Sequence, residues 1–194
     1  MTFTTASDQP FVVGLGGTTR PGSGSERALA VALEVAEELG ARTQLLAASQ
    51  LQLPLYAPER EERTPEAVRL VEALAAADGV ILASPGYHGG PSGLIKNALD
   101  YVEDLRDAAR TYLDGVPVGC IVCAHGWQAT ATTLQALRSV VHALRGWPTP
   151  FGAAINSAAG SVADADVRAQ VRLVGRQVTE LALLQRRARS LAGA

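Results

Sequence analysis

The stretch that decides the fold is FVVGLGGTTRPGSGS, residues 11–25. Its first part, Phe11 to Leu15, is entirely apolar or glycine, which is typical of a buried parallel strand. A loop of glycine, threonine and serine follows from Gly16 to Ser25, and an amphipathic stretch to about Leu39 predicts a helix. A strand, a loop of small residues and a helix in this order indicate the first unit of an α/β sheet.

The same alternation continues along the chain. Further strands are predicted at 43–48, 79–83, 116–124 and 151–155, and helices at 25–39, from 65 onward, 93–109, 128–144 and 167–181. Strict alternation requires a parallel sheet with right-handed crossovers. We therefore expect an α/β flavodoxin-like three-layer sandwich, a five-stranded parallel sheet of order 2-1-3-4-5, with residues 1–194 as a single domain. The last predicted helix carries a valine stripe, formed by Val167, Val171, Val174, Val178 and Leu181. This stripe is expected to pack on the sheet or on another subunit.

The bulk composition argues against several classes of protein. The formal net charge of −2 gives no reason to expect nucleic acid or an anionic membrane as a partner. No run approaches the ~20 apolar residues of a membrane helix. The segment Met1–Pro10 has no basic stretch followed by an apolar one, so no secretory signal is expected. These features favour a cytoplasmic protein.

Two cysteines, Cys120 and Cys123, stand in C-x-x-C spacing. A redox pair of this kind normally opens a helix, where the thiolate is stabilised. Here both residues fall within the strand predicted at 116–124, and residues three apart on a strand point to opposite faces. We interpret them as core cysteines.

The first loop has the composition of a phosphate-binding loop. Its glycines allow backbone N–H groups to approach a phosphate, and a helix N-terminus lies directly behind it. Thr18, Ser23 and Ser25 offer hydroxyl groups, and Arg20 offers a guanidinium. The chain lacks both the P-loop motif and the acidic residue of a dinucleotide site. The loop therefore predicts a site for one phosphate monoester; the alternative is a surface loop that Ser25 merely caps.

The second loop, Ser84-Pro-Gly-Tyr-His-Gly-Gly-Pro-Ser-Gly93, follows the third predicted strand. Proline and glycine favour an irregular path whose N–H groups face a flat ligand, with Tyr87 and His88 at its border. We expect His88 to position the ligand rather than to act as an acid or base, because it has no evident partner nearby in the sequence.

The third loop, Ala124-His-Gly-Trp-Gln-Ala-Thr130, is expected at the same edge of the sheet. Trp127 is either an aromatic wall for a ring system or a hydrophobic plug. His88, His125 and His142 are separated by whole elements, so no metal site is expected.

With these loops in place, residues 11–156 resemble the NAD(P)H-dependent FMN reductase family. The family pattern G-S-x-R-x-x-S-x-N corresponds to Gly17-Thr-Thr-Arg20 followed by Ser23 and Ser25, in a longer loop and with Glu26-Arg27 near the usual Asn. The pattern P-x-Y-[NH]-x-[SG]-x-x-G-x-L-K-N-x-[IL]-D-[WY] matches residues 85–101 nearly throughout. His125-Gly-Trp-Gln128 departs from the glycine-rich third loop of the family.

The resemblance implies a reductase that binds FMN non-covalently, with NADPH or NADH passing hydride from nicotinamide C4 to flavin N5. No catalytic side chain is expected, because the cofactor carries the chemistry. The residues expected to bind FMN are Thr18, Arg20, Ser23, Ser25, Pro85, Gly86, Tyr87, His88, Gly89, His125 and Gly126.

The resemblance also implies a homodimer or tetramer assembled through the helix near Lys96 to Tyr101. A flavin-dependent monooxygenase that receives reduced FMN is a possible partner. From the residues alone, Lys96 and Asp100 are equally an i,i+4 ion pair on one helix.

Three other functions stay open at this point. A quinone, azo-dye or metal-oxyanion reductase would keep FMN as a prosthetic group. A flavodoxin-like electron carrier is disfavoured by the net charge of −2 and by Arg20, since such carriers are usually strongly acidic. A non-catalytic binding module is the third, because a fold does not dictate a function.

Overall fold

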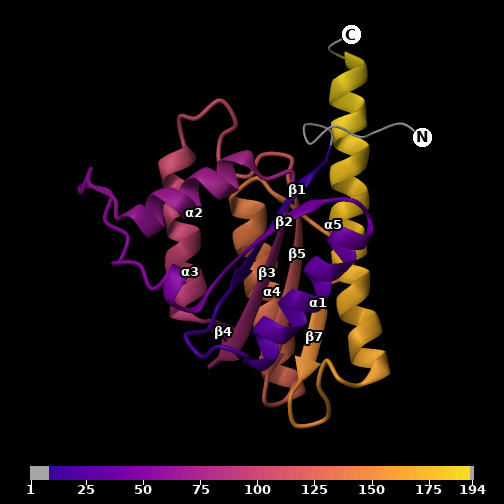
Figure 1. Cartoon of the computed structure of the whole chain (residues 1–194). Coiled ribbons are helices and arrows are strands. Elements are labelled where there is room, and N and C mark those ends of the chain that lie inside the picture. The colour runs from indigo at the N-terminus through magenta and orange to yellow at the C-terminus, as the bar shows by residue number, and fades with distance from the viewer. Residues whose placement is uncertain (1–8, 193–194) are drawn as a thin grey trace.

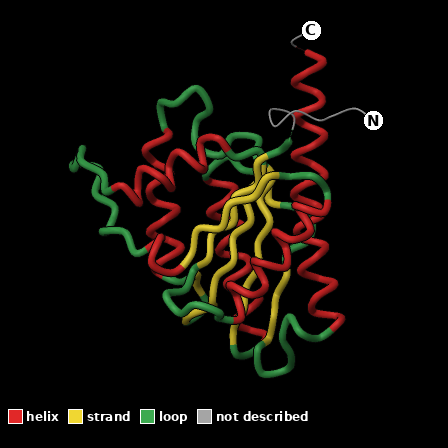
Figure 2. The backbone as a smooth tube through the Cα atoms, in the orientation of Figure 1, coloured by secondary structure: helices red, strands yellow, loops and turns green. Residues whose placement is uncertain are grey.

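The computed structural model describes residues 9–192, and the expectation about a secretory signal falls mostly outside this range. A central sheet lies between two layers of helices (Figures 1 and 2). The elements in chain order are β1 (Phe11–Gly16), α1 (Gly24–Glu38), β2 (Arg42–Ala47), α2 (Pro65–Ala76), β3 (Gly79–Tyr87), β4 (Gly90–Pro91), α3 (Gly93–Asp100), β5 (Pro117–Ala124), α4 (Trp127–Ala143), β6 (Trp147–Pro148), β7 (Ala153–Asn156) and α5 (Ala165–Ala192). Short 3₁₀ helices span Ala48–Leu51 and Tyr101–Leu105.

The parallel strands have the order β2-β1-β3-β5-β6, and β7 also pairs with β5. This confirms the expected flavodoxin-like order 2-1-3-4-5, because β6 and β7 share the fifth position. β6 pairs with the start of β5 and β7 with its end. Residues 149–152 separate the two, and Pro150 among them cannot donate a ladder hydrogen bond. β4 is an additional strand, antiparallel to β3.

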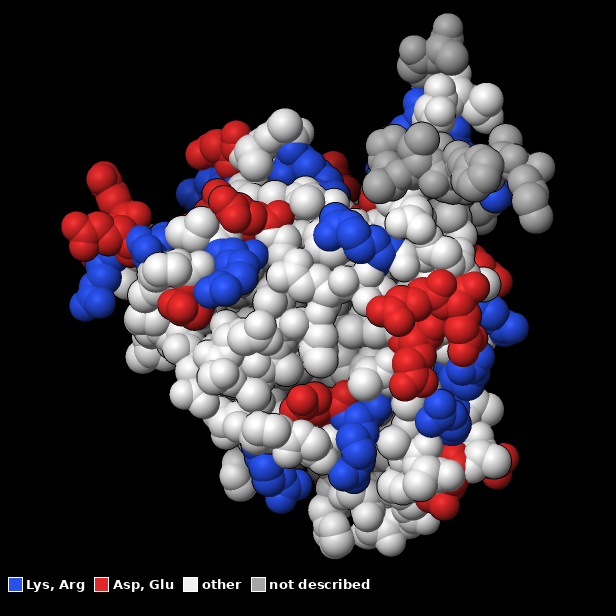
Figure 3. All heavy atoms as spheres, viewed as in Figure 1, with Lys and Arg blue, Asp and Glu red and all other residues white. Residues whose placement is uncertain are grey.

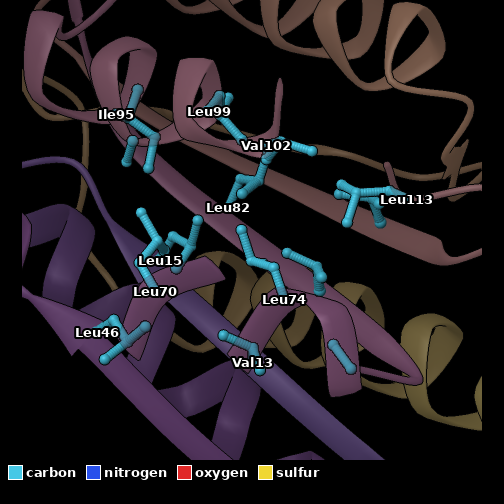
Figure 4. Packing of buried hydrophobic residues seen from close by; sticks show 14 of the residues in the cluster. Val13, Leu15, Leu46, Leu70, Leu74, Leu82, Ile95, Leu99, Val102 and Leu113 are labelled. Atoms are coloured by element: carbon cyan, nitrogen blue, oxygen red, sulfur yellow. The ribbon is translucent and has the colours of Figure 1, made fainter. Parts of the chain in front are cut away.

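The sheet separates two hydrophobic clusters. α2, α3 and α4 cover one face with side chains such as Leu70, Leu74 and Leu99 (Figure 4). α1 and α5 cover the other face, where Leu29 and Val174 are fully buried. Alternate residues of each strand feed the two clusters, as the period of a strand requires.

The valine stripe of α5 packs on the sheet, which decides between the two partners expected for it. Val174 and Val178 lie over Gly119 so closely that a methyl group there would come within 2.5 Å of Val174 and 2.8 Å of Val178. Gly175 similarly lets α5 approach the backbone of Ala32 on α1. The helix continues past the predicted end at 181 to Ala192, beyond the edge of the sheet (Figure 1).

The helix expected at 93–109 is shorter than predicted. The α-helix ends at Asp100, and the chain continues as the 3₁₀ helix Tyr101–Leu105. The tighter turn buries Tyr101 and Leu105, and the Tyr101 hydroxyl donates to the Pro54 carbonyl at 3.0 Å. Tertiary contacts therefore overrode the helical pattern here.

The two cysteines lie on opposite faces of β5, as expected. Cys120 belongs to the cluster under α2, α3 and α4, and Cys123 packs against the cluster under α1 and α5. Burial raises the pKa of Cys120 to about 12 and that of Cys123 to about 11, so both thiols stay protonated near neutral pH.

Charged side chains of both signs are interspersed over the face seen in Figure 3. Glutamates of α1 pair with arginines of α5, as in Glu38–Arg172 at 2.6 Å and Glu34–Arg168 at 3.2 Å. None of the helices within residues 9–192 combines the length and the apolar character that crossing a membrane would take.

Candidate functional site

The first two loops meet at the carboxyl edge of the sheet, at the lower end of Figure 1. The amide of Gly17 donates to the Ala83 carbonyl at 2.7 Å, and the Ser92 hydroxyl donates to the Gly17 carbonyl at 2.6 Å. The Ser92 amide in turn donates to the Ser84 hydroxyl at 3.0 Å. Since β1 and β3 are neighbours whose following elements lie on opposite sides, this edge is the topological switch point of the fold.

The first loop ends in a buried pair of hydroxyl groups. Ser23 accepts a hydrogen bond from the Glu26 amide at 3.3 Å and lies 3.3 Å from the Ser25 hydroxyl. Ser23, not Ser25, is therefore the N-cap of α1, which begins earlier than predicted. Within the described residues the amides of Gly24 and Ser25 find no acceptor, as is usual for a first helical turn.

Arg20 is exposed in the same loop, and no described residue pairs with its guanidinium. Its own amide donates to the Thr18 hydroxyl at 3.2 Å, which curls the loop back on itself. Arg27 instead donates to the Gly22 carbonyl at 2.8 Å and braces the loop. The expected residues thus present a free cation, hydroxyl groups and free amides in one segment.

The burial of the Glu26 carboxylate was not predicted from the sequence. It lies in the first turn of α1, and its Oε2 is buried without a hydrogen-bond partner in the described part of the chain. A carboxylate here is free to accept a hydrogen bond from a hydroxyl group of a ligand.

The second loop is a tight hairpin rather than the irregular path expected. β3 continues through Tyr87, which pairs with Gly90 of β4. The two residues between them, His88 and Gly89, have φ of 51° and 83°. Positive φ at both central positions is the mark of a type I′ turn. Gly89 meets this requirement without strain, whereas His88 is held there by the hairpin.

The hairpin presents its polar and aromatic groups outward. Tyr87 is 59% exposed and His88 is exposed, while Pro85 and Gly86 are half-buried. Gly86 approaches α4 closely, because a methyl group there would lie 2.8 Å from the Thr133 hydroxyl. The expected ring-binding residues therefore offer two exposed side chains and a stretch of half-buried backbone.

The third loop turns on Gly126, whose φ of 121° a residue with a side chain rarely adopts. Its amide donates to Asn156 Oδ1 at 2.9 Å. His125 is exposed and Trp127 is 64% exposed, so the interpretation of Trp127 as a hydrophobic plug is wrong. Sequence reasoning missed Asn156, because only the pairing of β7 with the end of β5 brings it to this loop.

The helix expected to form a subunit contact has a polar outer face. Lys96 and Asp100 are both partly exposed and pair at 2.5 Å. Asn97 faces inward, accepts the Tyr56 amide at 2.9 Å and donates to the Pro54 carbonyl at 2.9 Å. Tyr101 is buried, so within this segment it is Lys96 and Asp100 that face away from the core.

Chemically, this edge suits an elongated ligand with a phosphate at one end and a flat ring at the other. The phosphate end would meet Arg20, the hydroxyl groups and the N-terminus of α1. The ring would lie along the hairpin. Within residues 9–192 no group of three or more His, Cys, Asp or Glu side chains gathers as a metal site would require.

One family of known proteins matches most of this chain. The profile of the family described as "NADPH-dependent FMN reductase" matches residues 10–160. An NADPH azoreductase of Bacillus sp. (strain OY1-2) is 39% identical over 89 residues, which cover 45% of this chain and 47% of that protein. An FMN-dependent NADPH-azoreductase of Staphylococcus aureus is 33% identical over 102 residues, 53% of this chain and 50% of that protein. The chain thus spans about half the length of the relatives it matches.

Solved structures share the fold. FerB, a flavoenzyme NAD(P)H:(acceptor) oxidoreductase from Paracoccus denitrificans, superposes with a TM-score of 0.73 at 21% identity, over 89% of this chain and 97% of that one. An oxidoreductase from Corynebacterium diphtheriae gives a TM-score of 0.74 at 16% identity, over 91% and 98% of the two chains. At such identities the likeness concerns the fold.

Proposed function

Because this chain belongs to the NADPH-dependent FMN reductase family, whose profile matches residues 10–160, we propose that it is an NAD(P)H-dependent FMN oxidoreductase. FMN binds at the carboxyl edge of the sheet, across the ends of β1 and β3. The observation that carries this proposal is the hydrogen-bonded junction of the two loops, in which Ser92 holds the Gly17 carbonyl at 2.6 Å. The junction fixes the phosphate loop relative to the hairpin before any ligand arrives.

The residues present fit FMN at both of its ends. Arg20 and the free amides of Gly24 and Ser25 supply charge-assisted and backbone hydrogen bonds to a phosphate. Thr18, Ser23 and Ser25 add hydroxyl groups, and a methyl group at Gly22 would meet nothing within 4 Å, so a phosphate has room to approach. Bound FMN supplies the hydride chemistry, accepting from the nicotinamide of NADPH or NADH and passing electrons onward.

The protein's own groups bind and orient rather than react. Pro85, Gly86 and Gly89 present backbone to one side of the ring, and Tyr87 and His88 border it. His125 and Gly126, which follow β5, border the ring at its far edge. This accounts for the full set of proposed FMN-binding residues without a side chain that must accept or donate a proton.

The proposal is tested by an anaerobic titration of the FMN-reconstituted protein with NADPH and, separately, with NADH. The expected result is bleaching of the flavin absorbance by one equivalent of at least one nicotinamide. A protein that acquires no flavin spectrum, or whose flavin neither nicotinamide bleaches, contradicts it.

Whether FMN leaves as a product or stays as a prosthetic group decides the acceptor. Two relatives are named azoreductases, which supports bound FMN and an organic acceptor as the second candidate. Release of reduced FMN would serve a flavin-dependent monooxygenase. Gel filtration of the loaded protein separates the two, since a prosthetic flavin coelutes with the protein and a substrate flavin does not.

We further propose a single-domain cytoplasmic protein that forms a homo-oligomer through the outer face of α3. Lys96 and Asp100 give this face one charge of each sign, which is self-complementary about a two-fold axis. Light scattering of the wild type and of Lys96→Glu tests it. Loss of the oligomer in the variant supports the interface, and a monomeric wild type contradicts it.

A further inference from the structure

Trp127 is the most conspicuous unexplained residue of the candidate site. It is the first residue of α4 and remains 64% exposed. An indole exposed at this edge of the sheet offers an aromatic face that the described residues leave open. The loop that bears it also departs from the glycine-rich loop of the family pattern.

Hydrogen bonds on both sides of Trp127 fix the backbone that carries it. Gly126 adopts a φ of 121°, and its amide donates to Asn156 Oδ1 at 2.9 Å. The same oxygen accepts the Ala158 amide at 3.1 Å, so Asn156 is itself fixed. On the other side, the buried Thr130 hydroxyl donates to the Trp127 carbonyl at 2.8 Å. The indole is therefore presented from a rigid backbone, which lowers the entropy cost of a contact.

A second exposed ring lies on the neighbouring segment. Tyr87 is 59% exposed on the β3–β4 hairpin. This hairpin is attached to the start of α4, since the Thr133 hydroxyl donates to the Gly90 carbonyl at 3.3 Å. At Gly86 a methyl group would come within 3.3 Å of the Ala129 carbonyl. We call the two exposed rings, Tyr87 and Trp127, the aromatic rim.

The rim carries no negative charge of its own. Residues 84–92 and 124–130 contain two histidines and neither aspartate nor glutamate. Since the rim has aromatic faces for stacking and no carboxylate that would repel an anion, it suits a planar ring compound that is neutral or anionic.

We propose that Trp127 determines specificity for the electron acceptor by stacking against a planar, ring-bearing acceptor at the open side of the flavin site. This inference rests on the proposed function. The flavin ring is already bordered by the hairpin after β3, and Trp127 follows β5, one strand further along the edge. Because His125 and Gly126 directly before it border the flavin ring, Trp127 stands at the outer edge of the flavin site, where an acceptor would enter. A small, non-planar acceptor gains nothing from it.

The test compares two acceptors with the FMN-loaded protein and NADPH as donor. One NADPH and one proton reduce one 2-methyl-1,4-naphthoquinone to its hydroquinone, whereas two ferricyanide ions take up the same two electrons. Trp127→Ala is expected to raise the KM for the naphthoquinone about tenfold while the KM for ferricyanide is unchanged. Trp127→Phe restores most of the loss, because a smaller ring still stacks.

The matched control is the chain's other tryptophan. Trp147 is 55% exposed on β6, which pairs with the start of β5 and so lies away from the candidate site. Trp147→Ala is expected to leave both KM values unchanged. The FMN dissociation constant, measured by quenching of flavin fluorescence, should be the same in all these variants.

A ligand that cannot be reduced separates binding from turnover. Calorimetry with naphthalene-2-carboxylate is expected to show binding to the wild type and about tenfold weaker binding to Trp127→Ala, with cyclohexanecarboxylate bound weakly by both. Equal effects on both acceptors together with weaker FMN binding would overturn the inference and make Trp127 a flavin contact. Unchanged values for both acceptors would overturn it as well. If the protein binds the naphthoate through Trp127 but takes up no FMN, the role of the aromatic rim in binding planar compounds stands and the proposed function is contradicted.

Discussion

The two ends of the same parallel strands are built in opposite ways. At the amino end, Asp78 accepts hydrogen bonds from the Phe11 amide at 3.0 Å and from Arg186 and Arg189 at 2.8 Å. At the carboxyl end, the Arg20 guanidinium has no partner in the described part of the chain, and two aromatic rings stand in solvent. The amino end joins its charged groups in ion pairs, whereas the carboxyl end leaves a guanidinium and two aromatic rings without a partner among the described residues.

Arg110 shows the same character at the amino end. It donates to the Ala77 carbonyl at 2.7 Å and to the Leu74 carbonyl at 2.5 Å, and so caps the last turn of α2. Burial lowers the pKa of this guanidinium; the two carbonyls replace the lost water at its terminal nitrogens, while Nε is buried without a partner among the described residues. Stability therefore depends on groups at the amino end of the sheet, and ligand binding depends on groups at the carboxyl end. A substitution at one end should change one of these properties and leave the other unchanged.

The largest effect is expected from Asp78→Ala. The variant leaves two guanidinium groups and the Phe11 amide without their shared acceptor, which we expect to cost about 3 kcal/mol of unfolding free energy. Urea denaturation measures this loss, and exposed Asp107→Ala is the control. FMN affinity of the folded protein should not change. A large loss of affinity would show that the two ends are not independent.

Arg20→Ala is the converse experiment. Removing a charge-assisted contact to phosphate is expected to weaken FMN binding by roughly 10- to 50-fold. The free energy of unfolding should stay within about 0.5 kcal/mol, because the side chain is exposed and unpaired. Arg176→Ala on α5 is the matched control for the loss of one exposed arginine. Equal FMN affinity in the two variants would remove Arg20 from the site.

Two helix-capping residues at different places in the fold can be compared in the same way. Ser92 caps α3 and also holds the Gly17 carbonyl, whereas Thr64 caps α2 through the Ala67 amide alone. Thr64→Ala is expected to cost about 1 kcal/mol of stability, and Ser92→Ala should cost more because it also removes the buried donor to the Gly17 carbonyl. Only Ser92→Ala should also weaken FMN binding, by a few-fold, because it loosens the junction of the two loops. Thermal melts and FMN titrations of both variants measure this, and equal FMN affinities would contradict the role given to the junction.

The last effect is absent near neutral pH and appears only in alkali. Burial raises the pKa of Cys120 to about 12 and of Cys123 to about 11, above the ordinary thiol value of 9.0. The unfolded chain loses these protons first, so stability is fully present below pH 9 and falls as the pH rises toward 11 and 12. Urea midpoints across this range should decline less steeply in Cys120→Ala/Cys123→Ala. An identical slope would contradict the assigned burial.

The sequence predicted the sheet order, the opposite faces of the two cysteines and the position of the two main loops. These follow from local patterns, since apolar runs, capping residues and glycine-rich loops act over a few residues. The split of the fifth strand and the early end of α3 were not predictable, because they depend on contacts such as that of Tyr101 with Pro54. Asn156 was missed for the same reason: its partner, Gly126, lies 30 residues away in the chain.

The hairpin of the second loop was within reach of sequence reasoning. His88-Gly89 lies between segments that pair, and a glycine at the second central position is typical of a type I′ turn. The exposure of Trp127 could not be predicted from the sequence, because a tryptophan at a loop end is buried or exposed according to its tertiary surroundings.

The central claim is that the carboxyl edge binds FMN by its phosphate as well as by its ring. Equilibrium titration of the wild type and Arg20→Ala with FMN and with riboflavin tests it most directly, because riboflavin lacks only the phosphate. The wild type is expected to prefer FMN by at least about tenfold, and this preference should largely disappear in Arg20→Ala. Equal affinity of the wild type for the two flavins, or binding of neither, would contradict it.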